Sequence, residues 1–245
     1  MSEAAVAAGR AGIAFIEGIE VSARWDEFDV HVLGYSRHFR RGVLRERLAG
    51  TQRGYQDRIR NMVRLCQSAG YKKVSWAAIR RFRARLEGAV YVSYDVARQL
   101  TQQHGLSLEQ ARQLTTAGGA CYVPNGAWAL SLAEAAEVLH AAGAVAVLAH
   151  PGLVALDAGE AVMRRLVVSL PAANIDGIEV YHPYHSKAVV SQLALAAQQH
   201  TLLVTGGSDW HGYKRYAKSD EAFGRVGLAP DEWHRLLAAT SAANF

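Results

Sequence analysis

Residues 144–152 read Ala-Val-Ala-Val-Leu-Ala-His-Pro-Gly, six apolar residues that run directly into a His-Pro-Gly turn. An apolar run bounded by turn residues is typical of a strand buried on both faces of a parallel sheet. Two more apolar runs, 177–181 and 202–205, follow along the chain, separated by amphipathic helical patterns at about 158–170 and 187–199. Strands that alternate with helices predict the α/β class, with a parallel sheet covered by helices in an open or barrel arrangement.

The chain before this stretch contains two kinds of sequence. Short apolar runs bounded by glycine predict early strands at 13–16, 18–21 and 29–33, the last closed by Gly34. Residues 42–118 instead carry apolar residues at helical spacing, which predicts an all-helical insertion. We therefore expect an α/β domain made of residues 1–41 and 119–245, interrupted by a helical domain of residues 42–118.

Charge is distributed unevenly along the 245 residues. The segment from Arg37 to Arg98 holds 16 Lys and Arg against four acidic residues, whereas the rest of the chain holds 11 basic and 18 acidic residues. Such a basic segment favours an anionic partner, with nucleic acid or a phosphorylated small molecule first. A solvated helical face rich in arginine is the alternative reading.

Composition excludes several classes of protein. A chain that is 50% hydrophobic and 20% charged is neither disordered, nor a coiled coil, nor collagen-like. No apolar stretch reaches the roughly 18 residues that a membrane span needs, and the first residues do not have the pattern of a signal peptide. Cys66 and Cys121 lie far apart and outside any CxxC spacing, which predicts a reduced, cytoplasmic protein.

Polar residues follow the predicted strands at the edge where α/β proteins build their sites. They are His150 after the first quoted strand, His182 and His185 after the second, and Asp209 and His211 after the third. Glu20 and His31 lie on the early strands. Each residue alone is more often structural than functional, but imidazole with carboxylate and without thiolate suits Zn, Mn or Fe. The sequence contains no GxSxG, GxxxxGK[ST], HExxH or strand-linked GxGxxG motif.

Five motifs in one order resemble the PHP (polymerase and histidinol phosphatase) family of metal-dependent phosphoesterases. They begin at Gly18 (Gly-Ile-Glu-Val-Ser), His31 (His-Val-Leu-Gly-Tyr), Ala149 (Ala-His-Pro-Gly), Gly177 (Gly-Ile-Glu-Val-Tyr-His-Pro) and Gly206 (Gly-Gly-Ser-Asp-Trp-His-Gly). The branch that they resemble most is that of nucleoside 3′,5′-bisphosphate phosphatases and 5′-to-3′ exoribonucleases.

The resemblance implies a distorted (β/α)7 TIM-like barrel with an all-helical insertion. It implies up to three divalent ions (Mn, Fe or Zn) in the family, fewer here, and a nucleotide or RNA-end substrate whose phosphate a metal-activated water attacks. Carried over residue by residue, the metal ligands are Glu20, His31, His150, Asp209 and His211. His182 and His185 are the catalytic candidates, and Tyr181 lines the site as a phosphate contact. The basic segment around Arg58, Arg60 and Arg64 would attract phosphates.

Family members open with a strand that bears an HxH motif, and this sequence has none, so the resemblance implies a barrel that is incomplete at its N-terminus. Three explanations stay open: a fragment of an active enzyme, a short protein with a degraded site, or a barrel completed by a partner chain. An incomplete barrel exposes sheet edges, from which we expect self-association. The alternative function is a catalytically inactive PHP-like protein that binds nucleic acid or a partner through its basic helical insertion.

Overall fold

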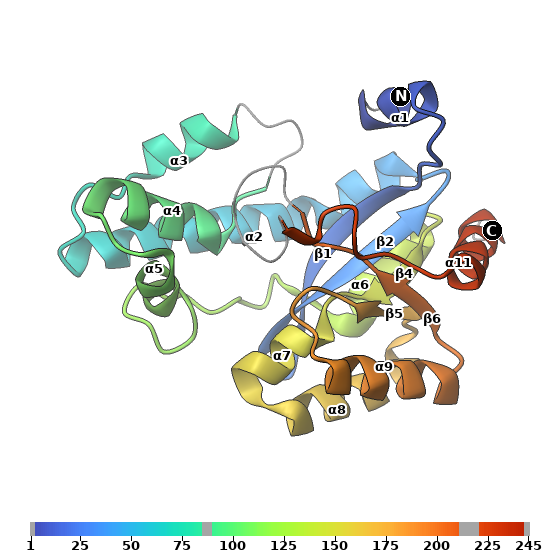
Figure 1. The fold of residues 1–245 in the computed structure, drawn as a ribbon. Coiled ribbons are helices and arrows are strands. Elements are labelled where there is room, and N and C mark those ends of the chain that lie inside the picture. The colour runs from blue at the N-terminus through green and yellow to red at the C-terminus, as the bar shows by residue number, and fades with distance from the viewer. Residues whose placement is uncertain (1–2, 85–89, 211–220, 243–245) are drawn as a thin grey trace. The chain divides into compact units, whose positions relative to one another are not determined.

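The computed structural model describes residues 3–84, 90–210 and 221–242, and Figure 1 shows the course of the chain. The chain folds as two compact units, one made of residues 1–46 and 130–245 and the other of residues 47–129. The first unit contains the sheet and the second is helical. The α/β class predicted from the sequence is confirmed.

The first unit is built on one six-stranded sheet with the order β3-β1-β2-β4-β5-β6. The strands are β1 (Glu17–Trp25), β2 (Phe28–Ser36), β3 (Leu130–Ser131), β4 (Val145–Leu148), β5 (Gly177–Tyr181) and β6 (Leu203–Gly206). Strands β4, β5 and β6 pair in parallel, as the apolar runs predicted. Among the described strands, only β2 runs against the others, because it pairs antiparallel with both β1 and β4. The sheet is therefore mixed, and its described end strands are β3 and β6.

Helices cover both faces of this sheet. The helical elements that lie wholly in the described part of this unit are α1 (Glu3–Arg10), α6 (Leu132–Ala141), α7 (Pro151–Ala158), α8 (Glu160–Ser169), the 3-10 turn η1 (Pro171–Ala173), α9 (Lys187–Gln199) and α11 (Pro230–Ala242). On one face, Leu236 of α11 joins Val145 and Val147 in a buried cluster. Helix α6 packs on the opposite face, where Gly34 and Ala146 lie side by side in β2 and β4. Figure 1 shows α8 and α9 next to one another beneath β5 and β6.

Three local expectations were wrong. Gly34 does not end its strand, since β2 continues to Ser36; a side chain at Gly34 would lie 2.4 Å from Leu139 of α6, so the glycine allows the helix to approach. The segment 13–16 is not a strand in the structure. A helix was predicted from about residue 158, but α7 already begins at Pro151, and Gly159 separates it from α8. Proline is favoured at the first helical position, where its missing N–H leaves no donor unsatisfied, so Pro151 itself marks the start of this helix.

The second unit is a small helical fold. It contains most of the long helix α2 (Arg41–Ser68), together with α3 (Trp76–Arg83), α4 (Ser93–His104) and α5 (Leu108–Thr115). Its buried core includes Ile59, Met62, Ile79 and Leu100, and both cysteines lie in it as free thiols. The helical character predicted for residues 42–118 agrees with α2, α3, α4 and α5 in the described part of that range. Among the described helices, none is both long and apolar enough to cross a bilayer.

Candidate metal centre

The hairpin of β1 and β2 places Glu20 and His31 on one face of the sheet. His31 lies directly opposite Ser22, and Glu20 lies directly opposite Leu33, so Glu20 and His31 are diagonal neighbours across the two strands. Side chains two residues apart along a strand point to the same face, which puts all four on one side. His31 Nδ1 lies 2.7 Å from Glu20 Oε1.

His150 reaches the same place from the carboxyl end of β4. The backbone N–H of Ala149 donates to the carbonyl of His31 at 3.0 Å, so the chain leaves β4 beside His31. His150 then adopts φ +29° and ψ +55°, a left-handed backbone that is costly for a residue with a side chain. Strain of this kind concentrates at functional sites because the surrounding structure must hold it in place. His150 Nε2 lies 3.3 Å from both Glu20 Oε1 and His31 Nδ1.

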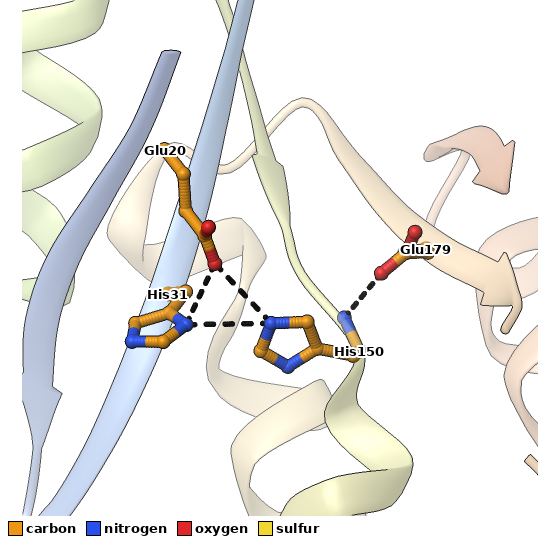
Figure 2. Close-up of polar contacts among 4 residues, drawn as sticks. All are labelled: Glu20, His31, His150 and Glu179. Carbon is orange, nitrogen blue, oxygen red and sulfur yellow. Dashed lines mark hydrogen bonds and ion pairs between the residues drawn. The ribbon is translucent and has the colours of Figure 1, made fainter. Parts of the chain in front are cut away.

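Figure 2 shows the three side chains pointing toward one another. Each of the three residues, Glu20, His31 and His150, offers one ligand atom, and these three atoms lie within 4.8 Å of one another. Tetrahedral coordination at about 2.0–2.1 Å separates ligand atoms by about 3.3 Å. The two distances from His150 Nε2 have this value, and the distance between His31 and Glu20 is shorter, at 2.7 Å. A carboxylate and two imidazoles are also the donors that Zn, Mn and Fe accept. The site therefore fits a divalent transition-metal ion.

Electrostatics keep the Glu20 carboxyl ionised. Partial burial raises the pKa of Glu20, but attraction by His31 and hydrogen bonds from both histidines outweigh that effect, and the pKa is held well below its usual value. The carboxylate side chain is still one-third exposed, so solvent and ligands can reach it. An anion beside two imidazoles is a suitable environment for a cation.

A second carboxyl, Glu179 of β5, borders the trio and is 5% exposed. Its Oε2 accepts a 2.7 Å hydrogen bond from the backbone N–H of His150 (Figure 2). Burial, together with repulsion by Asp209 and Glu20, raises the pKa of Glu179 to about 8, against the lowering effect of this hydrogen bond. At neutral pH the group is therefore mostly a neutral carboxylic acid.

His182 and His185 follow β5 and differ in how their ring nitrogens are used. His182 is 5% exposed; its Nδ1 accepts from the backbone N–H of Tyr184 at 3.3 Å, and its buried Nε2 has no hydrogen-bond partner among the described residues. Burial lowers the pKa of His182 to about 3, with repulsion from His150 and His185 adding to the effect. In His185 both nitrogens are engaged, Nδ1 with the carbonyl of Val180 at 2.8 Å and Nε2 with the N–H of Gly152 at 3.1 Å.

The other expected site residues lie in several places. The Tyr181 hydroxyl donates to Glu232 of α11 at 2.9 Å. Asp209 follows β6 with φ +54°, close enough to Glu179 to affect its pKa, but it does not join the three-residue group. His211 lies outside the described residues.

The three expected phosphate-attracting arginines belong to the helical unit. Arg58 is buried and donates to the carbonyl of Val123 at 2.6 Å, so its side chain supports the fold of this unit. Arg60 pairs with Asp57 at 3.0 Å, and Arg64, which is exposed, donates to Asn61 at 2.9 Å. Of the three, Arg60 and Arg64 are the ones that solvent reaches.

Comparison with known proteins supplies the family. A protein from Chromobacterium violaceum named 3′,5′-nucleoside bisphosphate phosphatase is 33% identical over 214 residues, which cover 86% of this chain and 72% of that protein. A 5′-3′ exoribonuclease Rnm from Salmonella typhimurium is 29% identical over 82% of this chain and 68% of its own length. The chain belongs to the PHP family of metal-dependent phosphoesterases. The resemblance inferred from its motifs is confirmed.

Solved structures agree with this membership. An amidohydrolase from Chromobacterium violaceum, solved with bound sulfate and no metal, superposes with a TM-score of 0.78 at 29% identity over 97% of this chain and 81% of the other. A metal-dependent phosphoesterase structure from Bifidobacterium adolescentis gives a TM-score of 0.76 at 23% identity over 97% and 80%, and shows the shared fold. No protein-family model matches the sequence.

Within this PHP-family chain, the sequence did not assign a role to Glu179. Its signal was a charged residue inside an otherwise apolar strand, Gly-Ile-Glu-Val, which is costly unless the group has partners. Nor did the sequence indicate that His185 contacts Gly152, a contact between residues 33 positions apart. Glu179 and His185 both contact the turn that carries His150.

Proposed function

We propose that this chain hydrolyses phosphate esters of nucleotides, with a nucleoside 3′,5′-bisphosphate as substrate. The observation that carries the proposal is the convergence of Glu20, His31 and His150 into a group with the spacing of a metal site. The relative named for this substrate shares 33% identity with the chain. Membership of a metal-dependent phosphoesterase family supports the same reaction class.

Glu20, His31 and His150 would hold a Mn, Fe or Zn ion, with Asp209 and His211 as further ligands. A divalent cation held there would supply Lewis-acid polarisation of a phosphate oxygen and a hydroxide nucleophile at neutral pH. We propose fewer than three ions, because the described residues form one three-ligand group.

His182 is the residue that we propose to act on the phosphate. Because its Nδ1 accepts a hydrogen bond from Tyr184, its proton resides on Nε2. This N–H is buried and has no partner among the described residues, a costly arrangement unless a ligand accepts from it. It would donate to a phosphate oxygen and stabilise the charge that develops during hydrolysis.

The test is phosphate release from adenosine 3′,5′-bisphosphate by the full chain supplied with Mn²⁺. Glu20→Gln and His31→Gln should abolish turnover and reduce Mn²⁺ binding, while both variants keep the wild-type circular dichroism spectrum. His200→Gln is the matched control, since it changes a half-buried histidine directly after α9. Equal turnover in the wild type and Glu20→Gln, or none in any sample with Mn²⁺, Fe²⁺ or Zn²⁺, would contradict the proposal.

A nucleic-acid-binding role without turnover is the second candidate, and the excess of basic residues from Arg37 to Arg98 favours it. The double variant Arg60→Gln/Arg64→Gln should then bind RNA more weakly. The slope of its affinity against salt concentration should fall by the contribution of about two phosphate contacts. Arg58 is not suitable for this test, because its guanidinium bonds inside the helical unit. An enzyme of the first kind would retain turnover of the small nucleotide in the double variant.

A further inference from the structure

The turn that carries His150 has its backbone amides satisfied by two side chains from a single segment. The N–H of His150 donates to Glu179 Oε2 at 2.7 Å, and the N–H of Gly152 donates to His185 Nε2 at 3.1 Å. Pro151, between them, has no N–H. The first amides of a helix have no partner within the helix, and here α7 begins at Pro151. Glu179 and His185 thus accept both hydrogen bonds that the turn can donate.

These contacts act on a backbone that needs support. His150 has φ +29°, a conformation that is unfavourable without surrounding constraints. The same residue must aim Nε2 at Glu20 and His31, which lie on other strands. A shift of this turn would move the imidazole away from the trio, while the rest of the sheet could remain intact.

The two acceptors are themselves fixed in place. Glu179 belongs to β5 and is buried. The His185 ring is held from its other side, since Nδ1–H donates to Val180 at 2.8 Å. The ring also lies against Gly152, where an added Cβ would come within 2.3 Å of it. With both nitrogens engaged, His185 has no free ring atom for proton transfer.

We infer that Glu179 and His185 are positioning residues that hold the His150–Gly152 turn and so aim His150 at Glu20 and His31. The role of the turn in metal binding rests on the proposed function, whereas the contacts that hold the turn do not. Partners that orient metal ligands typically change metal affinity by about 10- to 100-fold when they are removed. The two residues act through the backbone of the ligand and not through its ring.

The first experiment is made on the metal-free full chain by amide hydrogen exchange and ¹⁵N NMR. Glu179→Leu removes the acceptor, and the His150 amide should then exchange roughly three- to tenfold faster and shift. Glu179→Gln keeps a side-chain oxygen and should preserve the wild-type behaviour. Ile178→Val is the control, because it truncates the buried neighbour that points to the opposite face of β5.

The second experiment measures Co²⁺ affinity by visible absorption titration of the same proteins and of His185→Ala. Glu179→Leu and His185→Ala should each bind Co²⁺ about 10- to 100-fold more weakly, with an altered d–d spectrum. The Co²⁺ affinities of Glu179→Gln and Ile178→Val should stay within about threefold of the wild-type value. A loss of stability alone would not produce this difference between the two groups of variants. Since His185 is only half-buried, its variant provides a folded sample even if Glu179→Leu does not fold.

The outcomes separate the inference from the proposed function. Unchanged His150 and Gly152 amides in Glu179→Leu and His185→Ala, or unchanged Co²⁺ affinity, would overturn the inference. Weaker amide protection in these variants, with no nucleotide hydrolysis by the wild type, would support the inference and reject the proposed function. Equal losses in Glu179→Gln and Glu179→Leu would also contradict it, because the rescue depends on the retained acceptor.

Discussion

Replacing Gly152 by alanine should displace the turn that carries His150. The new methyl carbon would lie 2.3 Å from Cδ2 and 2.8 Å from Nε2 of His185. The ring cannot turn away without losing its bonds to Val180 at 2.8 Å and to the Gly152 amide at 3.1 Å. Overpacking typically costs about 1–3 kcal/mol, and each hydrogen bond contributes about 0.5–1.5 kcal/mol, so we expect the free energy of unfolding to fall by about 2–6 kcal/mol.

Urea unfolding of the metal-free chain, followed by circular dichroism, measures this loss. Adding His185→Ala removes the obstructing ring, so the double variant should be more stable than the sum of the single losses by about 1–3 kcal/mol. Gly207→Ala is the control, because a Cβ there would meet its nearest neighbour, Glu179 Oε1, at an ordinary 3.5 Å. Strict additivity, or a Gly152→Ala loss no larger than that of Gly207→Ala, would refute the reasoning.

Three further predictions concern other parts of the chain. In the interior of the helical unit, the Arg83 guanidinium bonds to Asp95 at 2.8 Å, so Asp95→Ala leaves a buried positive charge without its counter-charge. Urea unfolding should show that the free energy of unfolding falls by about 3–5 kcal/mol. Adding Arg83→Met should recover most of this stability. A hydrogen bond to Asp176 raises the pKa of His140 above its ordinary value of 6.5, against the effect of burial. The contribution of this pair to stability is therefore complete below pH 6.5 and is lost as pH rises through the folded-state pKa. The free energy of unfolding should therefore fall by up to about 1 kcal/mol between about pH 6 and pH 8, and His140→Gln should remove this part of the slope. Burial raises the pKa of the Cys66 thiol, so it should react with a disulfide reagent only after urea unfolding, and fast labelling of the native chain would contradict its position in the core.

The parts of the fold that the sequence predicted well are those governed by local pattern. The strand in residues 144–149 was expected because six apolar residues in a row cannot face solvent, and β4 occupies its centre. The pattern for residues 177–181 gave the bounds of β5, and that for 187–199 gave those of α9. Gly34 was misjudged because a glycine that ends a strand and one that admits a neighbouring helix look alike in sequence.

The site was predictable as a set of residue types but not as a geometry. Glu20, His31 and His150 were expected as ligands from their motifs, and the structure brings them together. The sequence could not distinguish His182 from His185, since both follow the same strand. The distinction depends on long-range contacts, because the N–H that occupies one nitrogen of His185 belongs to Gly152.

The direction of β2 explains why His31 takes part in this site at all. In a parallel sheet the polar site residues lie at the carboxyl ends of the strands, yet His31 lies near the beginning of its strand. Strand β2 returns antiparallel through a two-residue turn after Trp25, with Asp26 at φ +49°, so its amino end meets the carboxyl end of β4. Two-residue hairpin turns usually have the sequence Asn-Gly or Asp-Gly, and this turn contains no glycine. A shift of one residue in its register would move His31 to the other face of the sheet, so the metal site depends on the turn as much as on the ligands.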